Sequence, residues 1–264
     1  MTLESARASA GPVVIITGAS SGIGRALALR LGSEGYRVGL IARRLAELED
    51  ASAAIVEAGG AASPAAADVG DRADLRGAVA KIEDRLGPAD MLVANAGFGA
   101  PTRLDPLNTA EVEETFRVNV LGVIYAIEAV LPRMLARARG HLVAVSSLAA
   151  YKGLPGESAY CASKAAVNAY MEGMRIALRP RGVTVTTVCP GFVQTAMTPM
   201  DSAATPFLMS ADVAARRIAR VIAKGRGGVV RFPLPMALLM ALIARLPDAV
   251  VGRLIHAEPA KAPE

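Results

Sequence analysis

The sequence predicts one α/β domain built on a doubly wound parallel sheet with helices on both faces. Short β-type runs alternate with amphipathic segments of helical length from Val13 onward. Parallel strands need crossover connections, and helices usually supply them. The chain has 264 residues, of which 53% are hydrophobic and 4% aromatic. An α/β domain of this size buries a sizeable core, so the length requires no second domain.

Six strands are expected, each a short run of mainly β-branched or small apolar residues. They span residues 13–17, 36–42, 61–67, 91–94, 141–146 and 183–188. The third run is the weakest, because it consists mainly of Ala and contains Pro64. Without it, however, two helices would follow each other with no strand between them. Two long helices are expected over residues 110–137 and 158–179.

Charge and cysteine content exclude several classes of function. Lys and Arg total 29 against 24 Asp and Glu, but the basic residues are scattered at helix-like spacing, which is typical of a solvated surface. We therefore expect no nucleic-acid partner. Cys161 and Cys189 lie 28 residues apart without a CxxC pair or a nearby His cluster. Neither a disulfide framework nor a metal site is expected, and a reducing, cytoplasmic location fits best.

A glycine-rich turn follows the first expected strand and opens a helical segment. Residues 17–24 read TGASSGIG. Glycines let the backbone approach a pyrophosphate closely, and the first amides of the helix donate to it. The spacing is GxxxGxG rather than GxGxxG, and a glycine turn also serves as a plain tight connection. The order of strand, turn and helix predicts a Rossmann-type phosphate cradle.

Tyr160 and Lys164 are the first candidates for chemistry. They lie four residues apart in an expected helix, which puts both side chains on one face. A nearby ammonium favours the phenolate and lowers the Tyr pKa from about 10. A carbonyl reduction needs such a proton donor. Taken alone, this spacing is common on solvated helices.

The motifs together resemble the short-chain dehydrogenase/reductase family. They are TGASSGIG, the NAG of Asn95, Ala96 and Gly97, and a Ser-Ser pair before the helix of Tyr160 and Lys164. The match covers about residues 12–195. It implies an oxidoreductase that interconverts a carbonyl and an alcohol by hydride transfer with a nicotinamide cofactor. One departure is Ala94, where the family's NNAG motif begins with Asn.

The resemblance also implies a role for each candidate catalytic residue. Tyr160 is the general acid or base, and Lys164 additionally binds the nicotinamide ribose. Ser147 stands 13 residues before Tyr160 and orients the substrate oxygen. Asn119, in the expected helix, binds a water of a proton relay. Ser146 would point to the other side of its strand and is interpreted as structural.

NADP is the expected cofactor, and NAD is less favoured. The second strand ends without the acidic residue that accepts from the adenosine ribose in NAD-dependent proteins. Arg43 follows that position and can pair with a 2′-phosphate, although Arg43 and Arg44 also fit a solvated helix start, Arg44 more closely. Asp68 matches the adenine contact of the family but also fits an ordinary helix N-cap. The residues expected to bind the cofactor are Gly18, Ser20, Ser21, Gly22, Ile23, Gly24, Arg43, Asp68, Val69, Asn95, Ala96, Gly97, Tyr160, Lys164, Pro190, Gly191, Val193 and Thr195.

The C-terminal segment differs from the rest of the chain. Residues 229–246 are strongly apolar but interrupted by Arg231, Pro233, Pro235 and Arg245. A bilayer-spanning helix needs about 20 largely apolar residues, so no membrane span is expected. Three interpretations remain open: a core or subunit contact, a lid over the substrate, and a peripheral contact with a membrane surface.

Three parts of the chain are distinguished. Residues 1–12 are expected to be a flexible leader, since they lack the apolar run of a signal peptide. Residues 13–228 form the dinucleotide-binding and catalytic domain. Residues 229–264 form an apolar extension that packs on the same domain or at a subunit interface.

The sequence gives little information on the identity of the substrate. The segment 197–208 and its neighbour Met209 carry Met200, Phe207 and Leu208, which favours a hydrophobic ligand. The alternatives are a 3-oxoacyl thioester reductase and a non-catalytic NADP-binding sensor or interaction protein. By resemblance, a homodimer or homotetramer is expected to form through the two long helices.

Overall fold

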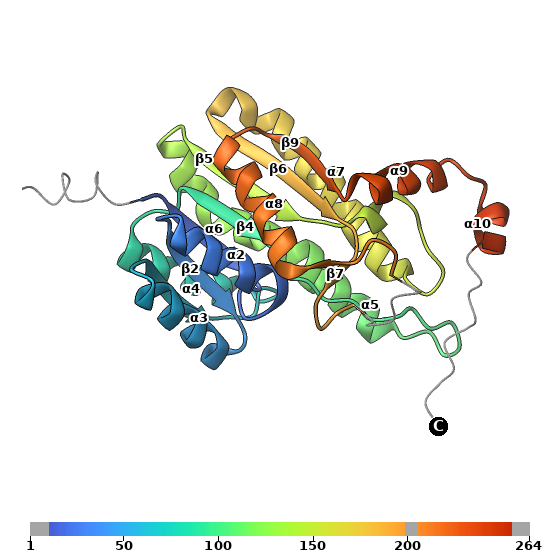
Figure 1. Cartoon of the computed structure of the whole chain (residues 1–264), viewed down its shortest axis with the longest axis horizontal. Coiled ribbons are helices and arrows are strands. Elements are labelled where there is room, and N and C mark those ends of the chain that lie inside the picture. Colours follow the sequence, from blue (N-terminus) through green and yellow to red (C-terminus); the bar gives the residue numbers. More distant parts are fainter. Residues whose placement is uncertain (1–10, 199–204, 255–264) are drawn as a thin grey trace, which may run out of the picture.

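Seven parallel strands form the central sheet of the computed structural model, which describes residues 11–198 and 205–254 (Figure 1). The spatial order is β3-β2-β1-β4-β5-β6-β9. The strands are β1 (Val13–Thr17), β2 (Arg37–Ala42), β3 (Ala61–Ala66), β4 (Met91–Ala94), β5 (Gly140–Val145), β6 (Val183–Pro190) and β9 (Gly228–Phe232). The doubly wound α/β prediction is confirmed.

The six predicted strands are all present, and their ends differ from the prediction by no more than two residues. Every residue of β1 is buried, which is typical of a parallel strand covered on both faces. Pro64 lies in β3, which pairs only with β2 and is therefore an edge strand. An edge strand tolerates proline because one side of its backbone needs no ladder partner. This explains how a run of alanines with one proline forms a strand.

Helices cover both faces of the sheet. One face carries α2 (Gly22–Ser33), α3 (Leu45–Glu57) and α8 (Ala211–Lys224), whose buried residues share a core with alternate residues of β1 and β2. The other face carries α4 (Arg72–Leu86), α6 (Gly122–Ala136) and α7 (Ser158–Leu178). Successive strand residues point to opposite faces, so Val14 and Ile16 enter the first core and Val13 and Ile15 the second.

A single long helical segment runs from residue 109 to residue 136, as predicted, but it is not uniform. It consists of α5 (Thr109–Phe116), a π-helical turn η1 (Arg117–Leu121) and α6. Among the described residues it is the one helix long and apolar enough to cross a membrane by length and composition. A core helix passes the same test, and α6 packs against the sheet through Val123, Ile127 and Val130.

The seventh strand was not predicted. The apolar run from residue 229 was interpreted as one segment, but it divides into β9 and α9 (Leu234–Ile243). β9 pairs in parallel with β6, from Thr186 opposite Gly228 to Pro190 opposite Phe232. A short helix, α10 (Asp248–Leu254), follows. β9 has only five residues, of which Val229 and Arg231 are exposed and Phe232 is buried. Such a short alternation is difficult to recognise in the sequence next to the apolar residues of α9.

Smaller elements complete the edge where the strands end. A two-stranded parallel sheet joins β7 (Val193–Gln194) to β8 (Met209–Ser210). Two short helical turns are η2 (Leu148–Tyr151) and η3 (Arg179–Arg181). Of the segment expected to contact substrate, residues 199–204, including Met200, lie outside the described residues. β1 has β2 on one side and β4 on the other, so a crevice is expected at the carboxyl ends of β1 and β4.

Candidate active site

The glycine turn after β1 leaves room that only glycine provides. Gly18 and Gly22 have positive φ angles of 68° and 54°. A Cβ at Gly24 would lie 2.2 Å from the Gly18 carbonyl oxygen, and a Cβ at Gly18 would lie 2.8 Å from Ala96 Cα. These close approaches keep the start of α2 pressed against the strand end. The exposed side of the turn therefore presents backbone rather than side chains.

The N-terminus of α2 is suited to an anion. Ser21 is its N-cap residue but makes no side-chain capping bond, and no acidic residue lies in the first turn. The first amides of a helix carry partial positive charge and need acceptors. Gly22, Ile23 and the preceding serines thus form a cradle whose chemistry fits a pyrophosphate.

Asn95 ties the end of β4 to the glycine turn. Its Nδ2 donates to the carbonyl oxygens of Thr17, at 3.0 Å, and Gly18, at 3.3 Å. Thr17 Oγ1 in turn accepts from the backbone amides of Asn95 and Ala96 at 3.0 and 3.1 Å. The predicted NAG motif therefore lies directly beside the glycine turn, although 78 residues separate Asn95 from Thr17 in the sequence.

Asp68 lies after β3 in a charged cluster on the expected adenine side. Its Oδ1 accepts from the Gly70 amide at 2.9 Å, and its Oδ2 accepts from Arg117 Nη2 at 2.9 Å. Burial disfavours the charged carboxylate, but these bonds and the nearby Arg43 outweigh it and hold the pKa of Asp68 below its ordinary value. The N-cap of α4 is Asp71, so the alternative interpretation of Asp68 as that cap is wrong. Val69 beside it is buried and packs on Gly122.

Arg117 was missed by sequence reasoning. It stands in the π-helical turn and binds Glu114 through Nε at 2.6 Å and Nη2 at 2.8 Å, in addition to Asp68. Its partner Asp68 is 49 residues away in the sequence. No local pattern marks such a pair, because only the packing of the π-helical turn against the end of β3 brings the two together.

Arg44 lies at a solvated helix start, as interpreted from the sequence, but it also contacts the glycine turn. It is the N-cap residue of α3, and its Nη2 donates to Ser20 Oγ at 3.0 Å and Ser21 Oγ at 3.1 Å. Its side chain is 56% exposed and pairs with Glu47. Arg43 is exposed and close enough to Asp68 to lower the pKa of that carboxyl. Arg44 therefore lies beside the cradle, whereas Arg43 lies near Asp68.

Asn119 is fully buried inside the π-helical turn. Its Oδ1 accepts from the Phe98 amide at 2.8 Å, while its Nδ2 donates to the Phe98 carbonyl oxygen and to Ser163 Oγ, both at 2.9 Å. A Cβ added to Gly97 would lie 3.5 Å from Asn119 Oδ1 and 3.6 Å from Lys164 Nζ. Gly97, Asn119 and Lys164 thus meet at one point. A π-helical turn often marks a functional position in a helix.

Lys164 lies in α7 with only 4% of its surface exposed. Its Nζ donates to the Val145 carbonyl oxygen at 3.1 Å and lies 5.7 Å from the centre of the Tyr160 ring. Burial lowers the pKa of this ammonium to about 8. Ser146 is buried and donates from Oγ to the Lys164 carbonyl oxygen at 3.1 Å, which agrees with the structural role expected for it.

Tyr160 lies beside Ser147, with which it shares a hydrogen bond. Burial raises the pKa of Tyr160 to about 12, and the hydrogen bond to Ser147 only partly opposes that shift. The prediction that the pKa of Tyr160 lies below 10 is therefore wrong for this structure, because burial of the phenol dominates the shift. The phenol is protonated at neutral pH. Ser147 Oγ also accepts from the Ala149 amide at 3.0 Å.

The turn after β6 brings four more predicted residues to this edge. Pro190 pairs with Phe232, and the Gly191 amide donates to the Phe232 carbonyl oxygen at 2.7 Å. Val193 is buried in β7, next to Met209. A Cβ at Gly22 would lie 3.0 Å from Thr195 Cγ2. Thr195 therefore borders the glycine turn, as a contact to the bound cofactor requires.

Other catalytic arrangements find no support in the part of the chain that the structure describes. His141 is buried in β5, where its Nε2 lies 2.8 Å from Thr186 Oγ1, and burial lowers its pKa to about 4. It therefore remains neutral and structural. Within residues 11–198 and 205–254, no group of three or more His, Cys, Asp or Glu side chains could hold a metal ion. Both cysteines are buried and unbridged.

Comparisons with known proteins agree with this site. A family model described as short chain dehydrogenase matches residues 12–205. An uncharacterized oxidoreductase of Myxococcus xanthus is 38% identical over 244 residues, which cover 91% of this chain and 96% of that protein. These matches extend over the glycine turn, the NAG motif and the Tyr160 helix.

Three solved structures share the fold. A 3-ketoacyl-ACP reductase from Sinorhizobium meliloti 1021 is 31% identical, has a TM-score of 0.78 and covers 86% of this chain and 100% of its own. An alcohol dehydrogenase from the archaeon Thermococcus sibiricus, in complex with 5-hydroxy-NADP, is 27% identical with a TM-score of 0.76, over 84% and 95%. A xylitol dehydrogenase bound to NAD+ is 25% identical with a TM-score of 0.76, over 84% and 98%. The chain therefore belongs to the short chain dehydrogenase family of NAD(P)-dependent oxidoreductases that act on CH–OH groups.

Proposed function

We propose that this enzyme reduces a ketone or aldehyde with NADPH, and that Tyr160 donates the proton. The observation that carries the proposal is that Asn119 and Lys164 meet at Gly97, while Tyr160, hydrogen-bonded to Ser147, lies beside Gly99 and near Lys164. The cradle fits a dinucleotide because its glycines leave backbone amides open to a pyrophosphate. When bound, the cofactor supplies the hydride.

Each catalytic side chain has a distinct task in this proposal. The Tyr160 hydroxyl is protonated at neutral pH and donates to the substrate oxygen as that oxygen gains negative charge. Ser147 holds the substrate oxygen in line with the phenol, because its Oγ lies within hydrogen-bonding reach of Tyr160. Lys164 places a positive charge below the phenol and returns a proton to it after turnover.

Asn119 positions Lys164 rather than acting on substrate directly. Its side chain fixes Phe98 and Ser163, which belong to the two segments that hold the lysine. The water-mediated relay that the family resemblance implies would start at the same point, next to Gly97. This arrangement keeps the ammonium aligned with the ring of Tyr160.

The preference for NADP rests on Arg43 and Arg44. β2 ends in Ala42, and no acidic residue is present there to accept from the adenosine ribose. The guanidinium of Arg44 next to Ser20, and that of Arg43 near Asp68, favour the 2′-phosphate. Turnover of Arg43→Asp with NADPH and NADH in parallel tests this preference. We expect the ratio of the two kcat/KM values to shift at least tenfold toward NADH, and an unchanged ratio would refute the NADP assignment.

A hydrophobic substrate is the second part of the proposal. Met197 is 47% exposed, and its Sδ lies within 3.6 Å of a Cβ added to Gly99, whose other neighbour is the Tyr160 ring. Phe207 is 53% exposed. The similarity to a 3-ketoacyl-ACP reductase supports a 3-oxoacyl thioester as the alternative substrate.

The rate of NADPH oxidation, measured with each compound of a panel of carbonyl substrates, tests this function. We expect aromatic, steroid-like or long-chain ketones to react with a higher kcat/KM than small hydrophilic carbonyls. Faster turnover of the hydrophilic compounds would contradict the hydrophobic assignment. A protein that binds NADPH but oxidises it with no member of the panel would be the non-catalytic NADP-binding alternative.

Self-association and cellular location belong to the same proposal. The long helices expose Phe116, Leu121 and Ile176, which suits a homodimer or homotetramer formed through α5–α6 and α7. Light scattering that finds only the monomer at working concentration would refute this assembly. A cytoplasmic location is consistent with two buried, unbridged cysteines.

A further inference from the structure

Helix α9 has one buried face and one face of exposed leucines. Met236, Ala237 and Met240 are at most 9% exposed and pack on Leu148 and Cys189 beside the active site. The opposite face carries Leu234, Leu238, Leu239 and Leu242, which are 65%, 63%, 40% and 60% exposed. Single exposed leucines are common, but four on a helix of ten residues form a continuous patch.

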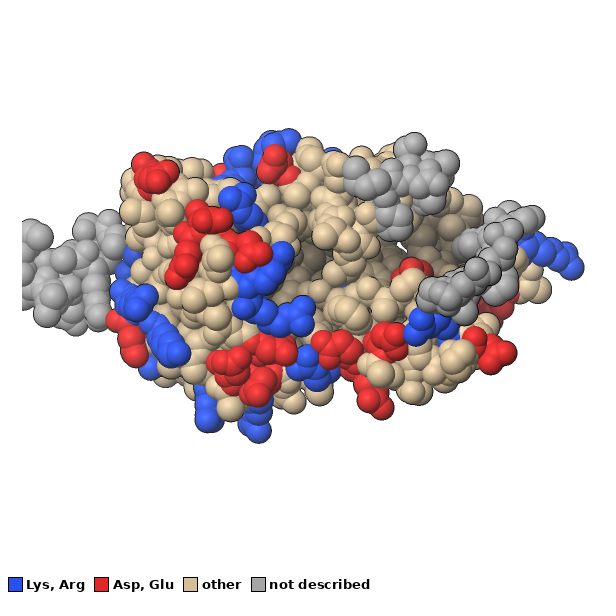
Figure 2. Space-filling view, turned by 90° about the horizontal axis from the view of Figure 1, so that it is seen from below, with Lys and Arg blue, Asp and Glu red and all other residues tan. Residues whose placement is uncertain are grey.

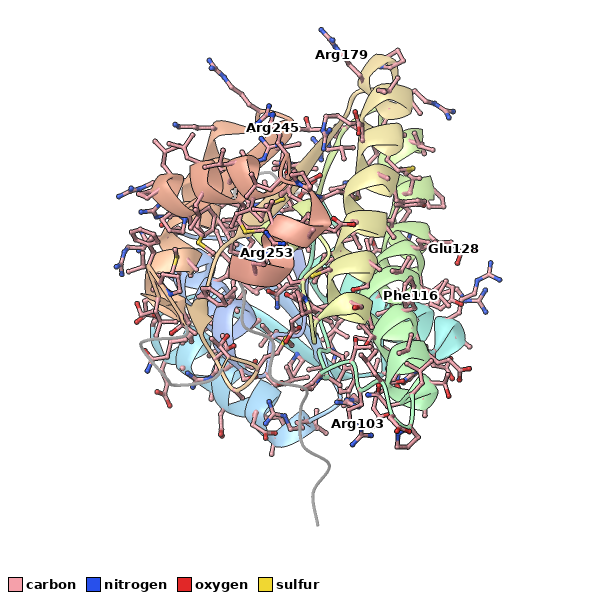
Figure 3. All side chains as sticks on the ribbon, turned by 90° about the vertical axis from the view of Figure 1, so that its right-hand side faces the viewer. Arg103, Phe116, Glu128, Arg179, Arg245 and Arg253 are labelled. Carbon is pink, nitrogen blue, oxygen red and sulfur yellow. The ribbon has the colours of Figure 1, made fainter. Side chains whose placement is uncertain are left out.

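The exposed leucines form a stripe that ends in a cation. Leu234, Leu238 and Leu242 are spaced by four residues, which places them on one side of α9, and Arg245 follows in the turn after the helix. Arg245 Nη1 donates to the Ala241 carbonyl oxygen at 3.0 Å, so the guanidinium stays at the end of this stripe. Figure 3 labels Arg245, in the turn after α9, and Arg253, in α10. We call Leu234, Leu238, Leu239, Leu242 and Arg245 the α9 face.

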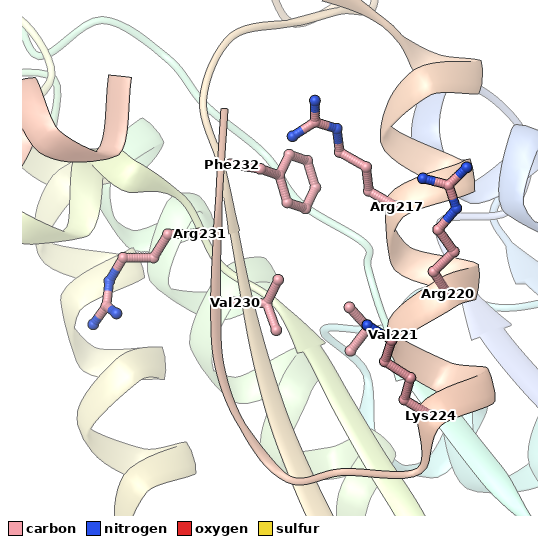
Figure 4. Close-up of a pocket in the computed structure, with 7 residues that line it drawn as sticks. All are labelled: Arg217, Arg220, Val221, Lys224, Val230, Arg231 and Phe232. Carbon is pink, nitrogen blue, oxygen red and sulfur yellow. The ribbon is translucent and has the colours of Figure 1, made fainter. Parts of the chain in front are cut away.

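The segment of the chain that contains the α9 face is rich in basic residues. Residues 213–247 contain seven Lys and Arg and no Asp or Glu. Four of these cations, Arg217, Arg220, Lys224 and Arg231, line a cavity of about 220 Å³ between α8 and β9 (Figure 4). The guanidinium of Arg231 extends to the other side of the strand, where it donates to Tyr151, a residue that packs with α9. By contrast, acidic and basic side chains are interspersed over the face of the molecule shown in Figure 2.

A second copy of the chain is a poor occupant of the α9 face. In a two-fold dimer each copy presents the same patch to the other. Arg245 would then meet a segment, residues 213–247, that offers no acidic side chain to pair with it. The next acidic residue, Asp248, already pairs with Lys152 Nζ of its own chain at 2.7 Å.

We propose that the α9 face docks on an anionic lipid surface. Leucines that enter the boundary between headgroups and acyl chains supply apolar burial, and flanking arginines attract anionic headgroups. α9 packs on Leu148, next to Ser147, so docking brings the membrane close to the active-site edge. The proposal concerns this surface and holds whichever carbonyl the enzyme reduces.

Co-sedimentation of the full chain with vesicles tests the proposal. We expect binding to phosphatidylcholine vesicles that contain phosphatidylglycerol, at least tenfold stronger than binding to phosphatidylcholine alone. The double variant Leu238→Ser/Leu242→Ser should lower the partition coefficient at least tenfold, since about 1.4 kcal/mol corresponds to tenfold and each buried leucine contributes more than that. Arg245→Gln should weaken binding about fivefold.

Matched variants distinguish docking of the α9 face from nonspecific adsorption of exposed apolar side chains to the vesicles. Leu104→Ser/Val56→Ser removes two apolar side chains that are 83% and 55% exposed elsewhere and should bind vesicles like the parent chain. The chain contains no Trp, so Leu242→Trp and Val56→Trp each introduce a single fluorophore. Emission should shift to the blue on addition of anionic vesicles only for Leu242→Trp.

Three results would overturn the proposal. The first is absence of binding to anionic vesicles by the parent chain, and the second is equal binding to neutral and anionic vesicles. The third is a smaller mass of Leu238→Ser/Leu242→Ser in light scattering, which would show that a second copy covers the α9 face. An unchanged mass together with lost vesicle binding supports lipid docking.

Discussion

Asn119 and Lys164 at the catalytic end of the crevice are 0% and 4% exposed, whereas the side chains of Asp68 and Arg117 at the adenine end keep 30% and 35% of their surface exposed. Both pairs join residues from different elements at the carboxyl ends of the strands. In the catalytic half, both polar side-chain atoms of Asn119 are matched by protein partners. In the adenine half, charged groups pair with one another in contact with solvent.

Under the proposed function, this difference separates the residues that carry the chemistry from those that recognise the cofactor. A buried polar group left without its partner costs roughly 1–3 kcal/mol, so the catalytic half depends strongly on each side chain. An exposed ion pair contributes roughly 0–1 kcal/mol because solvent screens it. Substitutions should therefore have large effects in the first half and small ones in the second.

Tyr160→Phe should have the largest effect. Removal of the hydroxyl eliminates the proton donor, and we expect kcat for carbonyl reduction to fall about 10³-fold. NADPH binding, followed by fluorescence of the reduced nicotinamide, should change less than threefold. Tyr170→Phe, on the same helix but away from Lys164, serves as the control. Comparable activity of both variants would contradict the role of Tyr160.

Asn119→Ala should affect both stability and turnover. The substitution leaves the Phe98 amide, the Phe98 carbonyl and Ser163 without their buried partner. We expect a loss of about 3 kcal/mol in the free energy of unfolding, together with a fall in kcat of about 30-fold through misplacement of Lys164. Thermal and denaturant unfolding measure the first effect. A fully stable variant would show that the π-helical turn does not depend on Asn119.

The pH dependence of reduction should reveal the buried lysine. Burial lowers the pKa of Lys164 to about 8, so the ammonium is charged below pH 8 and neutral above it. We expect kcat/KM to fall above pH 8, approaching about tenfold for each further pH unit. Tyr160, with a pKa raised to about 12, remains protonated throughout this range. A rate that stays flat from pH 7 to pH 10 would contradict the dependence on a charged Lys164.

Arg44→Ala should have the smallest effect, in the exposed half. Loss of the bonds to Ser20 and Ser21 should raise the KM for NADPH about threefold and leave kcat unchanged. The free energy of unfolding should change by less than about 0.5 kcal/mol. Arg30→Ala removes a similarly exposed pair with Glu34 and should leave the KM unaltered. A large fall in kcat for Arg44→Ala would contradict the expectation that substitutions in the exposed half have small effects.

Most of the fold was predictable because its signals are local. Each of the first six strands is a short apolar run between amphipathic segments, and the glycine turn needs residues that tolerate positive φ at fixed positions. Tyr160 and Lys164 share a helix face whatever the rest of the chain does. The seventh strand escaped prediction because β9 and α9 are both apolar and adjoin without a polar turn.

The sequence by itself determined the succession of strands and helices along the chain, the glycine turn expected to bind phosphate, and the reaction class. Each of these depends on residues that are close together in the sequence. Only the tertiary structure decided that Arg117 reaches Asp68, that Arg44 reaches Ser20, and that burial raises the pKa of Tyr160. It also decided that half of α9 stays exposed. Burial and long-range pairing depend on how segments that are distant in the sequence pack together. A local sequence pattern therefore does not determine how much of a side chain remains exposed to solvent.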